Sequence, residues 1–142
     1  MQDALALAER AASAGEVPVG AVIMQGARRL GAAHNETLTR RDPTAHAEML
    51  ALAQALAAAR SDRLSGATLY VTLEPCAQCA GALVLAKMGR VVYGAPDPKA
   101  GMAGSVSDLL RHPHLNHRAE VLGGILGDAC GRLLREFFEA RR

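Results

Sequence analysis

Residues 67–82, which read ATLYVTLEPCAQCAGA, decide the fold class of this chain. Residues 67–73 are rich in β-branched, aromatic and aliphatic side chains and predict a strand. Pro75 suits the first turn of a helix, which we expect to continue through residues 76–88. Cys76 and Cys79 then stand at positions i and i+3 near a helix start, so both sulfur atoms can reach one point. The N-terminal end of a helix also favours the thiolates that a metal ion needs.

Strands and helices alternate along the rest of the chain. Further strands are predicted at 17–24, 30–34, 90–95 and 119–124, and further helices at about 2–14, at 45–59, near 106–110 and at 128–142. Residues 25–29 form the turn between the first two strands, and Thr44 is the expected N-cap of the helix at 45–59. The pattern predicts an α/β fold in which a mixed sheet has helices on both faces. Because no repeat or linker interrupts it, we expect one domain over residues 1–142.

The composition indicates a globular protein without a strong nucleic-acid signature. Of the 142 residues, 50% are apolar and 21% are charged, and the net charge of +2 permits an anionic partner without requiring one. The chain has only two tyrosines, two phenylalanines and no tryptophan, which excludes a broad base-stacking platform.

Cysteine usage and the hydropathy pattern predict the compartment. Three cysteines, two of them three residues apart, favour metal binding in a reducing compartment over a secreted disulfide scaffold. Residues 1–12 lack the basic and apolar regions of a signal peptide. No apolar run approaches the ~18 residues of a membrane span. We therefore expect a cytoplasmic protein that does not contact a membrane.

His46 changes the interpretation of the cysteine pair. It falls at the start of the predicted helix 45–59, and one imidazole with two thiolates makes a three-ligand zinc site whose fourth position is open to water. Glu48 follows two residues later. Residues i and i+2 diverge on a regular helix, so the helix terminus must direct both side chains into one cavity. If it does, Glu48 is an acid/base beside the water and not a fourth ligand.

Other residues could build different sites. Cys130 could add a third thiolate and make the centre purely structural, although the surrounding LGDACGRLL favours a buried small apolar residue. His112, His114 and His117 could form a second metal cluster, but the residues around them favour a solvated loop. Glu74 could be catalytic, although orienting the turn before Pro75 is the simpler role.

The sequence resembles a known family of enzymes. His46-Ala47-Glu48 followed by Pro75-Cys76-Ala77-Gln78-Cys79 matches the H-x-E…P-C-x-x-C signature of zinc nucleobase and nucleoside deaminases. Five blocks, which span nearly the whole chain, make it similar to the bacterial tRNA-specific adenosine deaminases: residues 16–22, 40–49, 67–82, 89–105 and 137–142.

The resemblance implies a three-layer α/β/α cytidine-deaminase-like fold with a mixed five-stranded sheet, assembled as a homodimer. It implies one Zn²⁺ per subunit on His46, Cys76 and Cys79, with Glu48 moving protons. The implied reaction is hydrolytic deamination of adenosine to inosine at the wobble position of a tRNA anticodon loop, with arginine tRNA as the expected substrate. Carried over by position, the substrate-binding residues are Asn35, Ala47, Asp97, Lys99, Asn116, Phe138 and Arg141.

Simpler roles and other functions stay open at this point. Asn35 could serve a turn, Asp97 before Pro98 could simply stiffen a loop, and Phe137 and Phe138 could both be core residues. The same zinc residues would serve a deaminase of a free base or nucleoside, of the guanine or cytosine type, because pocket shape sets the substrate. A third alternative is a non-catalytic interaction module that zinc stabilises.

Overall fold

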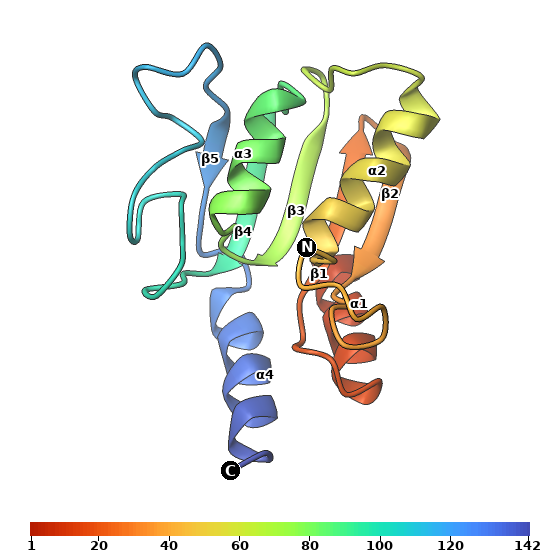
Figure 1. Ribbon diagram of the computed structural model, residues 1–142, viewed down its shortest axis with the longest axis vertical. Coiled ribbons are helices and arrows are strands. Elements are labelled where there is room, and N and C mark those ends of the chain that lie inside the picture. The colour runs from red at the N-terminus through yellow and green to blue at the C-terminus, as the bar shows by residue number, and fades with distance from the viewer.

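The computed structural model describes residues 1–142 and contains four helices and five strands (Figure 1). The helices are α1 (Gln2–Ser13), α2 (Ala47–Ala59), α3 (Ala77–Leu85) and α4 (Gly127–Glu139). The strands are β1 (Gly20–Gln25), β2 (Arg28–His34), β3 (Thr68–Leu73), β4 (Arg90–Ala95) and β5 (Glu120–Leu122).

The five strands form one mixed sheet in the order β2-β1-β3-β4-β5. β1 runs antiparallel to both β2 and β3, whereas β3, β4 and β5 are parallel to one another. Val71 in the central strand pairs with Ala21 of β1 and Tyr93 of β4. The prediction of a mixed five-stranded sheet is confirmed.

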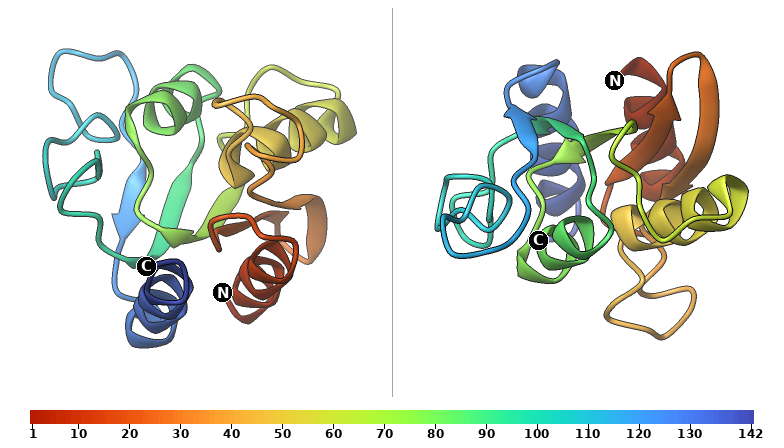
Figure 2. Two further views of the ribbon diagram at one scale, coloured as in Figure 1. Left: turned by 60° about the horizontal axis from the view of Figure 1, so that its bottom comes forward. Right: turned by 90° about the horizontal axis from the view of Figure 1, so that it is seen from above.

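Helices cover both faces of this sheet (Figure 2). α2 and α3 pack on one face, and α1 and α4 pack on the other. Leu69 and Val71 of β3 are fully buried together with Leu83 of α3, and side chains of this size each contribute about 1.5–3 kcal/mol when removed from water. α2 lies so close to β2 that a Cβ atom at Gly31 would overlap the backbone of α2. The three-layer α/β/α arrangement predicted from the resemblance is thus confirmed.

Several local predictions are wrong. Residues 106–110 form no helix, and this part of the chain contains only an isolated bridge between Ala103 and Asp108. Thr44 does not cap α2; its hydroxyl donates a hydrogen bond to Asp42 at 2.6 Å, and His46 is the N-cap. Pro75 lies outside α3, because Cys76 is the N-cap there.

Element boundaries differ from the predictions where the backbone conformation changes. α3 ends at Leu85 and not at residue 88, because Lys87 adopts a left-handed conformation with φ 57° that a helix cannot continue. The first strand begins at Gly20 and not at residue 17. The last helix ends at Glu139. No helix is both long enough and apolar enough to cross a membrane.

The topology brings the beginnings of α2 and α3 to one edge of the sheet. β3 ends at Leu73, and only Glu74 and Pro75 separate it from Cys76, the N-cap of α3. β2 ends at His34 beside the start of β1 and leads through a loop to His46, the N-cap of α2. His46 and Cys76, which are 30 positions apart in the sequence, are therefore neighbours at this edge.

Candidate metal centre

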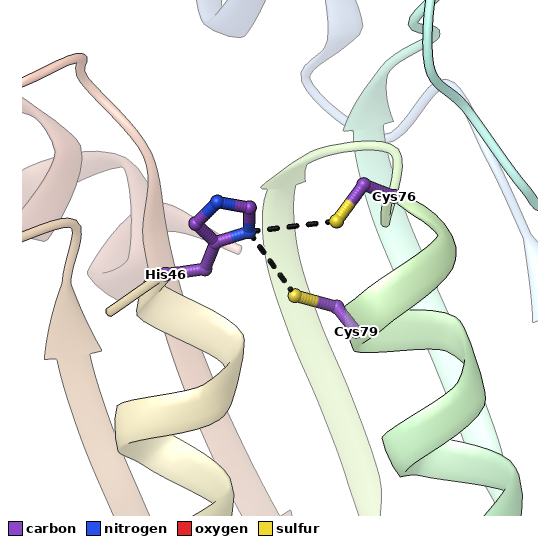
Figure 3. Close-up of side chains that lie close together, drawn as sticks. All are labelled: His46, Cys76 and Cys79. Carbon is purple, nitrogen blue, oxygen red and sulfur yellow. Dashed lines mark hydrogen bonds between the residues drawn. The ribbon is translucent and has the colours of Figure 1, made fainter. Parts of the chain in front are cut away.

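Three side chains from the starts of α2 and α3 point toward one another (Figure 3). His46 and Cys76 are the N-caps of the two helices, and Cys79 is the third residue of α3. Neither residue makes a side-chain capping hydrogen bond, and both have extended backbones, with ψ 151° at His46 and 179° at Cys76. The imidazole and the thiol are therefore free to face the gap between the helices.

The separations of the donor atoms fit a tetrahedral zinc ion. His46 Nδ1 lies 3.5 Å from Cys76 Sγ and 3.4 Å from Cys79 Sγ, and the three donor atoms lie within 4.8 Å of one another. Zinc bonds of ordinary length at a tetrahedral angle place nitrogen and sulfur about 3.6 Å apart. The cluster could thus hold a metal ion with little movement of its side chains.

The two thiols differ in their pKa values. A hydrogen bond from the Cys79 thiol, with a further contribution from His46, lowers the pKa of Cys76 to about 3. The same hydrogen bond, together with burial, raises the pKa of Cys79, so this thiol keeps its proton. The hydrogen bond with Cys76 also raises the pKa of His46. A divalent cation would replace the shared protons and stabilise both thiolates.

Glu48 lies beside this cluster. Its side chain is only 5% exposed, and burial raises the pKa of its carboxyl group because the charged form is poorly solvated there. The carboxyl group interacts with both His46 and Cys79. The divergence expected for positions i and i+2 does not apply, because His46 is an extended N-cap and not a helical residue. The helix terminus directs both side chains to the same place.

Asn35 offers a free hydrogen-bond acceptor at the same edge of the sheet. It directly follows β2 and is 6% exposed. Its Nδ2 donates to the Val17 carbonyl at 3.3 Å, but its Oδ1 is the single buried side-chain polar atom without a partner. The adjacent Glu36 bonds to Ala45, next to His46, and so keeps this segment close to the cluster. A buried acceptor of this kind is normally satisfied, so Oδ1 is suited to a donor from a ligand.

A broad groove of about 1670 Å³ runs between α4 and the segment that follows β4. Four of the residues predicted to bind substrate line it: Asp97, Lys99, Phe138 and Arg141. The metal cluster itself does not line this groove. Leu73 does, and it stands three residues before Cys76. Asp97, which also lines the groove, donates its amide hydrogen to Glu74, two residues before Cys76. The segment that follows β3 thus links the groove to the cluster.

The groove carries more positive than negative side chains. Its cations are Lys99, Arg132, Arg135, Arg141 and Arg142, and its acidic residues are Asp97, Asp128 and Glu139. A surplus of cations attracts phosphate groups. The carboxylate of Asp97 is partly used within the loop, where it accepts hydrogen bonds from the amides of Lys99 and Ala100.

The two adjacent phenylalanines of α4 have different environments. Phe137 is buried at 7% exposure, and the Arg141 guanidinium lies over its ring, 3.4 Å from the centroid. Phe138 is 48% exposed and faces the groove. Only Phe138 is therefore available to a ligand.

Other candidate residues lie away from the cluster. Asn116 accepts a hydrogen bond from Lys87 at 2.8 Å, at the edge of the sheet where β4 begins, which is opposite the metal centre. Cys130 is buried against Gly94 and is not part of the metal-binding group. The three histidines of the 112–117 loop do not join that group either.

Comparisons with known proteins agree with this geometry. All 142 residues match the MafB19-like deaminase family. A tRNA-specific adenosine deaminase from Bacillus subtilis (strain 168) is 46% identical over 142 residues, which are 100% of this chain and 88% of that protein. The chain belongs to this deaminase family.

Solved structures of deaminases also superpose on this member of the family. One comes from studies of A-to-I editing by tRNA:A34 deaminases at the wobble position of transfer RNA; it has a TM-score of 0.90 and 39% identity over 94% of this chain and 97% of that chain. Another, from work on a guanine deaminase of Nitrosomonas europaea, has a TM-score of 0.81 and 25% identity over 94% of this chain and 80% of that chain. The fold thus serves more than one substrate.

The sequence missed several residues of this deaminase that the structure brings forward. Arg132 and Arg135 line the groove, and their helical spacing of three is the one signal that could have placed them on the same side. Glu16 is a fully buried acid that bonds to the backbone of the loop after β2. Glu74, for which the sequence predicts only a catalytic role or a role in the turn before Pro75, bonds to the backbone of the loop after β4. Nothing in their spacing predicts these partners, which lie more than 20 residues away.

Proposed function

We propose that this deaminase hydrolyses adenosine to inosine at the wobble position of tRNA. The observation that supports this proposal most strongly is a His-Cys-Cys cluster beside a buried glutamate, linked through the segment after β3 to a groove with surplus cations. A free base would need only the cluster and its immediate surroundings. A folded RNA needs a surface for its backbone as well.

His46, Cys76 and Cys79 would hold one Zn²⁺ per subunit, and the bound ion would supply the Lewis acidity that activates water at neutral pH. Glu48 performs the proton transfers. Its raised pKa suits a group that accepts a proton from water and gives it to N1 of adenine. Glu48 then accepts the proton of the new C6 hydroxyl group and passes it to the departing amine. Water adds at C6 and ammonia leaves, so the balanced products are inosine and ammonia.

Asn35 and Ala47 would bind the base. Deamination of a base in a loop requires the nucleotide to turn out of the stack into a pocket. The unpaired Oδ1 atom of Asn35 can accept a hydrogen bond from such a base. Ala47 is fully buried next to His46, so it is its backbone and not its side chain that would line the pocket.

The groove residues would hold the anticodon loop on either side of that base. Lys99 and Arg141 can neutralise phosphates, and the exposed ring of Phe138 can stack on a neighbouring base. Asp97 orders the loop that presents Lys99. Asn116 is on the far edge of the sheet, so only a part of the tRNA distant from the anticodon could meet it.

The outer surfaces of α2 and α3 support a homodimer. Both helices are apolar nearly all round, and their exposed residues include Ala53, Ala57 and Leu85, the last of them 81% exposed. A helix with no polar face is normally covered. A second copy is the occupant that we propose, and light scattering of the purified protein would test it. A tRNA substrate also fits the cytoplasmic location, which stays a prediction.

The second candidate function is deamination of a free base, because a guanine deaminase shares the fold. The decisive experiment supplies the zinc-loaded protein with an anticodon stem-loop of arginine tRNA that carries adenosine at the wobble position. Free adenosine, cytosine and guanine are tested in parallel. We expect inosine in the stem-loop and no turnover of the free compounds. Turnover of a free base with an unchanged stem-loop would contradict the tRNA assignment, and no turnover at all would favour the non-catalytic module.

A further inference from the structure

Glu74 lies between the end of β3 and Cys76, and its carboxylate is buried at 2% exposure. One carboxylate oxygen accepts a hydrogen bond from the amide of Asp97 at 3.0 Å. The other accepts from the amides of Ala103 at 2.9 Å and Ser105 at 3.1 Å. The Ser105 hydroxyl donates a further hydrogen bond. One side chain thus binds three points of the loop formed by residues 96–105.

The loop also makes hydrogen bonds of its own, such as that from the Gly101 amide to the Asp97 carbonyl at 2.9 Å, but these do not attach it to the segment after β3. It contains no helix or strand, so its amides need partners from elsewhere. The backbone beside Glu74 supplies two further hydrogen bonds, from Met102 to the Pro75 carbonyl at 2.8 Å and from Glu74 to the Ala95 carbonyl at 2.9 Å. Gly101 packs directly on the carboxylate, where a Cβ atom would overlap it. Glu74 is therefore the side chain that attaches this loop to the segment between β3 and α3.

Glu74 and the loop that it binds belong to different parts of the site. Glu74 is two residues from Cys76 of the metal cluster, whereas the loop presents Asp97 and Lys99 to the groove. We propose that Glu74 is a positioning residue that sets the place of the groove loop relative to the metal centre. This proposal rests on the proposed function, because it assumes that substrate binds to both. Glu74 itself is not one of the metal-binding residues and does not line the groove.

A carboxylate is needed at this place, and an amide would not replace it. Two backbone N–H groups point at one oxygen and a third at the other, and hydrogen bonds from N–H groups to a charged oxygen are the stronger kind. In Glu74→Gln one of these oxygens becomes an NH₂ group, whose hydrogens would face an amide hydrogen. The side chain keeps its volume but leaves at least one loop amide without an acceptor.

The test separates binding from chemistry. In Glu74→Gln we expect KM for the stem-loop to rise about tenfold while kcat stays within about threefold and the zinc content is unchanged. Gly101→Ala should have the same effect from the loop side, because its methyl group would displace the loop from an intact Glu74. Ser105→Ala removes only the hydroxyl bond and should raise KM about threefold. It also keeps the test available if the first variant does not fold.

Matched controls make the same two substitutions, Glu to Gln and Gly to Ala, at positions away from the loop. Glu120→Gln changes an exposed glutamate that pairs with Arg90, and Gly66→Ala adds a methyl group near only the flexible end of Gln25. Neither should change KM. A purely structural role would lower kcat and thermal stability together without a selective change in KM, and that result would overturn the proposal.

Hydrogen exchange makes the proposal testable without catalysis. The amides of Asp97, Ala103 and Ser105 should exchange at least about tenfold faster in zinc-loaded Glu74→Gln, while amides of β3 and α3 keep their protection. If the wild-type protein does not deaminate the stem-loop, the proposed function fails, yet this measurement still decides the role of Glu74. Unchanged exchange in the loop would overturn that role.

Discussion

His46 Nδ1 lies 3.4 Å from Cys79 Sγ, although 33 residues separate them in the sequence. The contact exists because the antiparallel β1 brings the exit of β2 next to the exit of β3, so two helices begin side by side. The donors come from two helix starts that the sheet holds in place, and no loop must close to complete the set. A centre of this kind is largely preformed before a metal ion arrives.

Replacing any one of His46, Cys76 or Cys79 by alanine should remove the bound metal. A three-ligand centre that loses one donor keeps two, which are insufficient for tight binding of zinc. We expect wild-type protein to contain about one zinc per chain and the variants less than about a tenth of that. Metal analysis after dialysis measures the content directly.

Cys130→Ala is the matched control for this experiment. Cys130 is buried against Gly94, outside the cluster, so the variant should keep its zinc. Loss of zinc from Cys130→Ala would instead indicate a closed structural centre with three thiolates and would contradict the catalytic assignment.

Glu48→Gln should abolish turnover without releasing the metal. Glutamine has the same shape but cannot move a proton, and general acid–base catalysis contributes about 10²–10⁴-fold. Because burial disfavours the charged carboxylate, the neutral amide should also leave the free energy of unfolding unchanged or slightly higher. Single-turnover deamination, zinc content and thermal unfolding are measured on the same sample. Turnover within about threefold of wild type would contradict the role of Glu48.

How much the sequence predicts depends on whether a feature is local. The i and i+3 spacing of Cys76 and Cys79 needs only one helix start, and the strand at 68–73 needs only its own side chains. The direction of the His46 ring is harder to predict from the sequence. It depends on His46 being the extended N-cap of α2, whereas residue preferences favour Thr44 for that position.

The loop after β4 shows the opposite case. Residues 106–110 have the composition of a short helix, yet the preceding loop bonds to Glu74, and the Leu110 carbonyl accepts a hydrogen bond from the amide of Ala119 at 2.9 Å. Such hydrogen bonds between residues far apart in sequence override a local preference. The position of Asn116 could not be predicted from the sequence for the same reason. Only the folded chain shows that its loop lies at the edge of the sheet opposite the metal centre, where Lys87 donates a hydrogen bond to it.

Alanine substitutions of Phe137 and Phe138 should have different effects, the first on stability and the second on RNA binding. Phe137→Ala removes a buried ring, together with the surface on which Arg141 lies, and should lower the free energy of unfolding by about 3 kcal/mol. Phe138→Ala truncates an exposed ring in the groove and should change stability by less than about 1 kcal/mol. Its affinity for the anticodon stem-loop should nevertheless fall about tenfold, as expected when one base loses a stacking partner. Chemical denaturation and fluorescence anisotropy measure the two effects. Equal affinity of wild type and Phe138→Ala for the stem-loop would show that Phe138 of the groove does not contribute to binding.

Glu16 should make the stability of the protein depend on pH in the acid range. Its carboxylate is fully buried and accepts hydrogen bonds from the amides of Leu38 and Thr39 at 3.0 and 2.7 Å. Burial alone would raise the pKa of this group, but the hydrogen bonds from Thr39 and Leu38 outweigh it and hold the pKa below its ordinary value of 4.5.

A lowered pKa in the folded state means that the unfolded chain binds the proton more tightly. The stabilisation by Glu16 is therefore complete above the ordinary value of 4.5, and it is lost as the pH falls through the lower pKa of the folded state. Glu16→Gln should be less stable than wild type at pH 7 by about 1–3 kcal/mol, because one amide of the 35–45 loop loses its acceptor. The difference should shrink steadily below pH 4.5.

Urea denaturation at a series of pH values measures that difference directly. Glu9→Gln, which changes an exposed glutamate of α1, is the control and should follow wild type at every pH. Release of zinc in acid affects all three proteins alike, so only the difference between their curves is informative. A constant difference between wild type and Glu16→Gln from pH 7 to pH 3 would show that the Glu16 carboxylate does not stabilise the folded state through its charge. The hydrogen bonds from the Leu38 and Thr39 amides would then contribute the same free energy of unfolding whether the Glu16 carboxyl group is charged or protonated.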